Sequence, residues 1–288
     1  MNILLIGHSI IDHYKIENIE LIKPGGIYYS AAGMLYIKNN EDNLFLLTGI
    51  NKNSYNLFEK VYSKLNLTLS TELDNMPEVS LKIYEHQERD EFYKNISSPL
   101  SLDKINDWNL FNGILINMIT GFDISLDQLK YIRKNFNGLI YLDIHTLSRG
   151  VDENLKRNFR LIPQAEEWLS NIDIVQCNEN ELKTLFNYED DYMIIKKVMT
   201  LKPELLVLTK GMNGAEVYFK DNHQIGKYSI QAEKVVVKNK VGCGDIFGSV
   251  FFYLYLRTHD IMNSLKIANK IAALSVSSVN IEDWLKLC

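Results

Sequence analysis

Short apolar runs recur along the chain, and most of them end at a Gly, Asp, Asn or Thr. A surface helix would show polar residues with a period near 3.6, and these runs do not. They are typical of strands that are buried on both faces, as in a parallel sheet. The predicted strands are Ile3–Gly7, Leu44–Gly49, Gly113–Asn117, Leu139–Asp143, Ile172–Cys177 and Leu205–Thr209.

Longer amphipathic stretches separate several of these runs and predict helices. They are Ser125–Phe136, Asp152–Leu169 and Glu179–Phe186. Alternating strands and helices indicate βαβ units, which build the mostly parallel sheet of an α/β protein. In such sheets ligands bind beyond the carboxyl ends of the strands, so the polar residues that follow each run are the first candidates for a site.

Two stretches break this alternation. Val79–Tyr93 alternates apolar and polar residues and predicts antiparallel strands that are half open to water. Gly214–Val237 predicts a β-meander with Asp221-Asn222 as a turn. There is no repeat and no linker in the sequence, so we expect one domain over residues 1–288 with a small β lid formed by segments near 8–30 and 79–95.

Composition narrows the classes of protein. The chain has 288 residues and a formal net charge of -5, and it lacks the basic cluster of a nucleic-acid binder. No apolar run approaches the roughly 20 residues that cross a membrane. The first residues do not look like a signal peptide. The three cysteines, Cys177, Cys243 and Cys288, form no CxxC pair. We therefore expect a cytoplasmic protein without disulfides or a zinc site.

The segment Lys240–Gly248, KVGCGDIFG, carries the most specific chemistry. A tight glycine turn leads into the apolar run Ile246–Leu256, which predicts a buried helix. The first backbone N–H groups of a helix have no partner within it and favour an anion such as a phosphoryl group. Asp245 would lie beside that anion and could accept a proton from an attacking hydroxyl. An ordinary helix start with Asp in its first turn is the alternative.

Two further strand ends carry polar residues. Asn178-Glu179-Asn180-Glu181 follows one strand and could hold Mg²⁺ through its water shell. A helix start with Asn178 as N-cap and Glu181 at N3 is an alternative reading, and both can hold together. The segment Thr209–Ala215, TKGMNGA, follows another strand. Its glycines favour a loop that passes close to a nucleotide, although an ordinary turn between strands would look the same.

Taken together and in this order, these segments resemble the ribokinase-like PfkB family of carbohydrate and nucleoside kinases. The signatures are NENE at 178–181, TKGMNGA at 209–215 and VGCGDIFGSVFF at 241–252. GHSIID at 7–12 and PGGIYYSAAGM at 24–34 are similar to the family's first strand and double-glycine segment, and 267–281 is similar to a helix beside the adenine. The resemblance implies a three-layer α/β/α sandwich with a mostly parallel central sheet and a small β-sheet lid.

The resemblance also implies roles for individual residues, ATP and Mg²⁺ as cofactors, and a small-molecule alcohol as substrate. Asp245 would be the catalytic base, beside an anion hole made by the backbone. Lids of this family often pair, which implies a possible homodimer. The remaining implied roles are the anion hole for Gly242, Cys243 and Gly244; Mg²⁺ and phosphates for Asn178 and Glu181, the latter through water; the nucleotide site for Thr209, Gly211 and Gly214; and the acceptor site for Asp12, Gly25, Gly26 and Ser30.

The sequence departs from the family pattern at several points. Ser30 stands where the family usually has Asn, which suggests a reshaped acceptor pocket. Arg149 is a candidate phosphate contact at an unusual spacing, and Asp143 is expected to support the site. His8 and His145 also follow strands, and we interpret both as hydrogen-bonded loop residues.

Three functions from different classes follow. The first is an ATP-dependent kinase that phosphorylates a hydroxyl of a sugar or sugar-like molecule. The second is a catalytically silent family member that acts as a binding or regulatory protein. The third, a dinucleotide-binding oxidoreductase, is disfavoured because Ile3–Gly7 is not followed by a GxGxxG turn.

Overall fold

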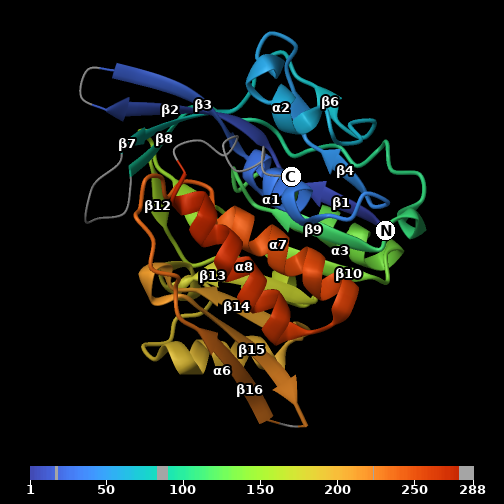
Figure 1. The fold of residues 1–288 in the computed structure, drawn as a ribbon, viewed down its shortest axis with the longest axis vertical. Helices are drawn as coiled ribbons and strands as arrows, with labels where there is room; N and C mark the ends of the chain where they lie inside the picture. Colours follow the sequence, from blue (N-terminus) through green and yellow to red (C-terminus); the bar gives the residue numbers. More distant parts are fainter. Residues whose placement is uncertain (17–18, 83–89, 223, 279–288) are drawn as a thin grey trace.

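The computed structural model of the chain describes residues 1–16, 19–82, 90–222 and 224–278. An eight-stranded sheet forms its centre (Figure 1). The strands lie in the order β16 (Gln224–Ile230), β15 (Ala215–Asp221), β14 (Leu205–Thr209), β13 (Ile174–Asn178), β10 (Leu139–Asp143), β9 (Gly113–Asn117), β1 (Asn2–Ile6) and β4 (Asn43–Leu47).

Six of these strands, from β14 to β4 in the sheet order, are parallel to one another, and β15 and β16 extend the sheet antiparallel. All six strands predicted from the sequence are present, three of them with the predicted bounds. β4 and β9 lie on opposite sides of β1, so the order of the strands reverses there. Reversal points of this kind open a crevice for ligands at the carboxyl ends of the strands.

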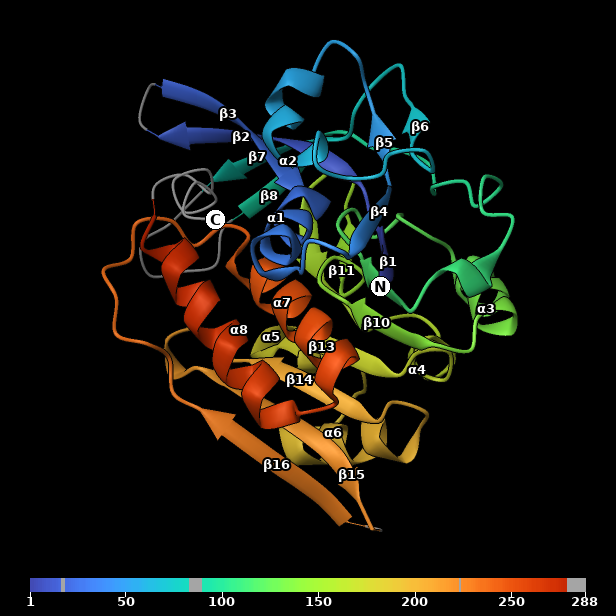
Figure 2. The same ribbon diagram turned by 45° about the vertical axis from the view of Figure 1, so that its right-hand side comes forward.

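Helices cover both faces of the sheet and complete the predicted three-layer sandwich (Figures 1 and 2). Along β1, Leu4 and Ile6 pack into the core on one side, whereas Ile3 and Leu5 pack into the core on the other. The first core holds α3 (Leu126–Asn135), α4 (Ala165–Leu169), α5 (Glu179–Leu182) and α6 (Asp191–Thr200); the second holds α1 (Ile27–Ile37), α2 (Glu59–Tyr62), α7 (Cys243–Thr258) and α8 (Ile261–Val276).

A separate four-stranded sheet lies beside the large one, above the start of α7 in Figure 1. We call it the small sheet. It is built from the segments expected to form a lid, except that residues 17–18 and 83–89 of that prediction lie outside the described residues. Its strands are β3 (Ile19–Gly26), β2 (Ser9–Ile16), β7 (Glu78–Lys82) and β8 (Asp90–Asn95). Two short pairs complete the strands: β5 (Gly49–Ile50) with β6 (Thr71–Glu72), and β11 (Arg149–Val151) with β12 (Arg157–Phe159).

The prediction of a helix over Asp152–Leu169 is wrong for most of its length. Only α4 is helical, and β12 occupies the middle of the stretch. The Asp152 carboxylate accepts hydrogen bonds from the backbone N–H groups of Asn154 and Lys156, which folds the chain into a tight turn. Asp side chains compete with helices in this way.

Two other predicted bounds also differ from the structure. The meander expected to reach Val237 ends with β16 at Ile230, and residue 223 of that stretch lies outside the described residues. The helix expected over Glu179–Phe186 stops at Leu182. Within the described ranges, no helix is long and apolar enough to span a membrane.

α1 and α7 pack closely because one glycine lies at their contact. A Cβ added at Gly33 of α1 would lie 2.6 Å from Ser249 Oγ and 3.1 Å from the backbone of Ile246, both on α7. Any side chain there would separate the two helices, since interiors of proteins are close-packed.

We predict that Gly33→Ala destabilises the fold by about 1–3 kcal/mol, the usual cost of overpacking. Its melting temperature should fall by several degrees in thermal denaturation. Gly244→Ala is the matched control, since among the described residues nothing lies within 4 Å of a Cβ added at Gly244. Only melting temperatures are compared. A Gly33→Ala protein as stable as the wild type would contradict the close contact.

Candidate active site

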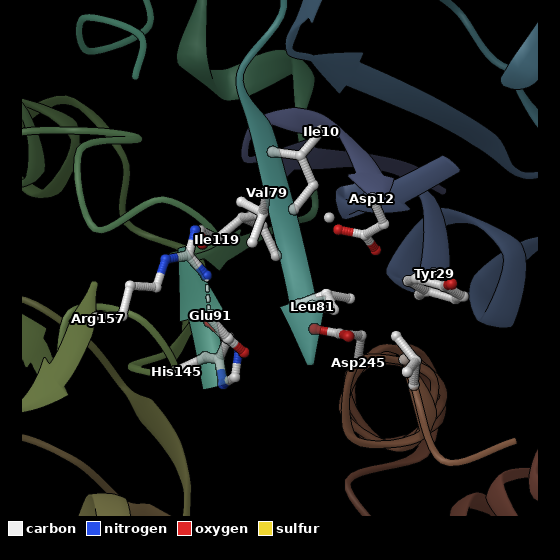
Figure 3. A pocket seen from close by; sticks show the side chains of 13 residues that line it. Ile10, Asp12, Tyr29, Val79, Leu81, Glu91, Ile119, His145, Arg157 and Asp245 are labelled. Atoms are coloured by element: carbon white, nitrogen blue, oxygen red, sulfur yellow. Dashed lines mark hydrogen bonds and ion pairs between the residues drawn. The ribbon is translucent and has the colours of Figure 1, made fainter. Parts of the chain in front are cut away.

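Asp245 lies in the first turn of α7, next to the glycine turn that precedes the helix (Figure 3). Gly242 is the N-cap of α7 and has φ 78°, a left-handed conformation that favours glycine. A Cβ at Gly242 would collide with the ring of Tyr29. The turn therefore needs glycine for its conformation and for the close approach of α1. The predicted helix start is confirmed.

Asn117 orients the Asp245 carboxylate. It is the last residue of β9 and is buried, and its Nδ2 donates to Asp245 Oδ1 at 2.6 Å. The same amide donates to Ser30 Oγ at 3.1 Å. Hydrogen bonds to a charged group contribute about 1.5–3 kcal/mol each, so this contact holds the carboxylate firmly.

Asp12 lies across a cavity from Asp245 (Figure 3). It belongs to β2 and is buried. A side chain at Gly25 would collide with the Asp12 carboxylate, so the glycine leaves room for it. The backbone of Gly26, at the start of α1, also lines the cavity and has φ 69°.

The hollow between these walls measures about 350 Å³, part of which is open solvent. Its lining falls into an apolar group and a polar group. Small ligand sites with few charged groups and apolar walls fix a substrate by shape and by a limited set of hydrogen bonds. The apolar residues are Ile10, Val79, Leu81, Ile119 and Val241, and the polar side chains are Asp12, Tyr29, Glu91, His145, Arg157 and Asp245.

Tyr29 lies close enough to Asp12 and Asp245 to interact with both carboxyl groups. Burial raises the pKa of Tyr29 well above its usual range, and Tyr14 and Asp12 raise it further. The phenol therefore stays protonated and is a hydrogen-bond donor near Asp12 and Asp245.

A second polar cluster surrounds Glu181. As predicted, Asn178 caps α5 and forms a capping box with Glu181, whose Oε2 accepts from the Asn178 backbone at 2.9 Å. Glu181 Oε1 lies 3.0 Å from His145 Nδ1 and 3.1 Å from Arg149 Nη1. Burial opposes ionisation of Glu181, but His145, Arg149 and the Asn178 N–H outweigh it and lower the pKa. Glu181 is therefore an ionised carboxylate within a basic surrounding.

Asp143 lies between the two clusters. Burial raises the pKa of Asp143 well above its ordinary value, and the carboxylates of Glu181 and Asp245 raise it further. Gln176 Nε2 donates to Asp143 Oδ2 at 2.8 Å and to the Gly244 carbonyl at 3.1 Å. This amide links Asp143 to the glycine turn, so Asp143 supports the site rather than facing the cavity.

The predicted nucleotide residues have separate structural roles. Thr209 ends β14 and pairs with Asn178 in the sheet. Gly211 has φ 53°, and no described atom would meet a Cβ there. Gly214 has φ 90°, and a Cβ there would collide with the Ile230 carbonyl. Gly214 is thus explained by the turn itself, whereas Gly211 leaves its backbone open to a ligand.

The structure places two residues differently from the positions expected from the sequence. Ser30 does not line the cavity; it is buried on α1 and accepts from Asn117. His145 lines the cavity as well as pairing with Glu181, so it is more than a loop residue. His8 is a buried loop residue, as expected, with Nε2 3.1 Å from the Ser98 carbonyl.

Sequence reasoning missed Asn117, Tyr29, Glu91 and Arg157. Asn117 could have been found, because it ends a buried strand at the ligand edge, as Asn178 and Thr209 do. Among the described residues, no group of three or more His, Cys, Asp and Glu side chains could hold a metal ion.

Residues 145–284 match the family model described as pfkB family carbohydrate kinase. This match covers just under half of the chain. The chain is a phosphotransferase whose acceptor is an alcohol group. Among proteins of curated function, no match to this kinase was found.

Several solved structures have the same fold and align with almost the whole length of this chain. A pyrophosphate-dependent kinase in the ribokinase family, in complex with sulfate, is 14% identical over 98% of this chain and 99% of its own, with TM-score 0.82. A pyrophosphate-dependent kinase of that family with a pyrophosphate analogue and myo-inositol is 14% identical over 98% of each chain, with TM-score 0.80. The Arabidopsis thaliana ribokinase with ribose and ATP is 16% identical over 99% of this chain and 98% of its own, with TM-score 0.72.

We predict that Asn117→Leu lowers the kcat of the kinase about 10- to 100-fold, which corresponds to one lost hydrogen bond to a charged group. Acceptor and donor KM values should change less than threefold, since the side chain orients Asp245 and does not line the cavity. Steady-state kinetics on protein with an unchanged melting temperature tests this. An unchanged kcat would show that the contact does not position the carboxylate.

Proposed function

We propose that the chain transfers the γ-phosphoryl group of ATP to a hydroxyl of a sugar or sugar-like small molecule, with Asp245 as general base. One observation carries this proposal. Asp245 lies beside the Gly242–Gly244 turn, where a phosphoryl group can bind. It also lines a cavity whose opposite wall contains Asp12. Acceptor and phosphoryl group would therefore meet at this carboxylate.

The reaction needs one proton transfer and one displacement. The acceptor oxygen forms a bond to the γ-phosphorus, the bond to the bridging oxygen of ADP breaks, and Asp245 takes the acceptor's proton. The backbone N–H groups in the first turn of α7 and the helix dipole would stabilise the negative charge on the phosphoryl oxygens. Asn117 keeps the carboxylate oriented during this step.

The surface next to the glycine turn supports a nucleotide as donor. The loop 231–241 is held against α8, because the backbone N–H groups of Lys238 and Asn239 bond to the Val276 carbonyl. It exposes three consecutive valines, Val235, Val236 and Val237, with Val236 77% exposed. Exposed apolar residues at this place suit a purine ring, and Gly211, in the turn after β14, leaves its backbone open to a ligand.

Inorganic pyrophosphate is the second candidate donor. The fold resembles the two structures of pyrophosphate-dependent kinase, with TM-scores of 0.82 and 0.80, more than the ATP-bound ribokinase, with 0.72. The one with myo-inositol also makes a cyclic polyol a candidate acceptor. Either donor would present its terminal phosphoryl group to the same turn.

Mg²⁺ fits this site only as a companion of the donor. Both oxygens of Glu181 are occupied by Asn178, His145 and Arg149, which leaves them to water-mediated contact. Mg²⁺ often keeps several waters and binds through one or two carboxylates and the phosphates of the substrate. Bound in this way, it would neutralise charge on the donor phosphates, with Asn178 and Glu181 holding its waters.

We further propose that the small sheet acts as a lid. Its strands supply Ile10, Asp12, Val79 and Leu81 to the cavity, so its position decides how far the cavity is open. A homodimer through this lid is supported by Leu21 and Ile22 of the edge strand β3, which are 40% and 52% exposed. Light scattering distinguishes a dimer from a monomer. Cys177 and Cys243 are not joined in a disulfide, which supports a cytoplasmic location that cell fractionation tests.

We expect Asp245→Asn to lower kcat by several orders of magnitude, because the amide cannot accept the hydroxyl proton. Release of ADP or phosphate from Mg-ATP or Mg-pyrophosphate, against a panel of sugars, polyols and nucleosides, measures this. Glu78→Gln on the small sheet is the control. A protein that binds ATP but turns over no acceptor, with or without Asp245, would instead favour the silent binding protein.

A second variant distinguishes ATP from pyrophosphate as the phosphoryl donor. We expect Val236→Glu to raise the KM for ATP at least tenfold, because the added charge opposes a bound nucleotide. Because pyrophosphate has no ring to contact Val236, its KM should stay within twofold. Val236 is highly exposed, so the fold should tolerate the change. If the wild type uses pyrophosphate alone, the ATP proposal fails.

A further inference from the structure

A buried ion pair forms part of the cavity wall on the side away from Asp12 and Tyr29 (Figure 3). Arg157 Nη1 lies 2.5 Å from Glu91 Oε2, and the two side chains are only 3% and 4% exposed. Arg157 comes from β12 and Glu91 from β8 of the small sheet.

The guanidinium is fixed on several sides. Its Nη2 donates to the Ile119 carbonyl at 3.2 Å, and its carbon lies 4.1 Å from the centre of the Tyr93 ring. The Tyr93 hydroxyl in turn donates to the Thr120 carbonyl. Nε of Arg157 is buried and has no hydrogen-bond partner among the described residues. A buried polar atom of this kind is an unmet donor beside a ligand cavity.

Other contacts already join β8 to the hairpin formed by β11 and β12, so the ion pair is not needed for that purpose. The backbone of Tyr93 already bonds to Leu155 at 2.9 Å, and Phe92 and Lys156 form a bridge between the same segments. Buried ion pairs add little stability compared with apolar side chains of similar volume. The presence of this pair at the cavity therefore points to a role toward the ligand.

We propose that the Arg157–Glu91 pair selects uncharged, polyhydroxylated acceptors, an inference that rests on the proposed acceptor site. Glu91 neutralises the only guanidinium of the described cavity lining, and Asp12 and Asp245 add two carboxyl groups to that lining. A phosphate or carboxylate on the acceptor is repelled. Hydroxyl groups remote from the reacting one meet the polar pair, and the carbon face of the ring lies over Ile10, Val79 and Ile119.

The test compares each neutral acceptor with its charged counterpart: myo-inositol with its monophosphate, D-ribose with ribose 5-phosphate, and D-glucose with glucuronate. The wild type should prefer the neutral member by at least 100-fold in kcat/KM. Glu91→Gln leaves Arg157 without its counterion, and this preference should shrink at least tenfold. Glu78→Gln is the matched control, since it removes a carboxylate that pairs with His13 at 2.7 Å on the same sheet, outside the cavity lining.

An unchanged preference in Glu91→Gln, with turnover that depends on Asp245, would overturn this inference and leave the proposed function standing. No turnover of any acceptor by the wild type would overturn the proposed function itself. If Glu91→Gln does not fold, inhibition of the wild type decides. The charged counterpart should inhibit only above 100 times the KM of the neutral acceptor, and inhibition near that KM would refute the selection.

Discussion

The contact between α1 and α7 is the constraint on which the site depends. Gly33 lets the backbone of α1 reach Ile246 and Ser249, and Gly242 leaves space for Tyr29. Both helices begin at the ligand edge of the sheet, α1 at the Gly26 backbone and α7 beside Asp245. Their packing thus sets the distance between the cavity wall at Gly26 and the Asp245 carboxylate. The central sheet adds the third fixed point through Asn117 at the end of β9.

Much of this arrangement could be predicted from the sequence. Buried strands are visible as apolar runs because both faces of each strand pack against helices. The Gly242 turn and the Asn178 cap are local, and each depends on residues within three or four positions. Local chemistry of this kind can be read directly from a sequence. The helix expected over Asp152–Leu169 failed because a single Asp side chain bonded to the backbone and outweighed the amphipathic pattern.

Contacts between distant residues could not be predicted in the same way. Glu91 and Arg157 are 66 positions apart, and Asn117 and Asp245 are 128 apart. No local sequence pattern identifies either partner, because each residue acquires its role only when the fold brings the other close to it. The β11–β12 hairpin shows this most clearly. Its Arg149 reaches Glu181 on one side and its Arg157 reaches Glu91 on the other, so one short hairpin contacts both polar clusters of the site.

The fit between Asp12 and Gly25 has a consequence for how this pocket can change in evolution. The carboxylate occupies the space that any side chain at position 25 would need. Neither position is therefore free to vary alone, because a larger residue at 25 expels the acid, and loss of the acid leaves a void beside a bare backbone. The geometry therefore favours joint change at the two positions. A lineage that altered its acceptor through this wall would have to exchange both residues together, whereas changes at the Arg157 wall could accumulate independently.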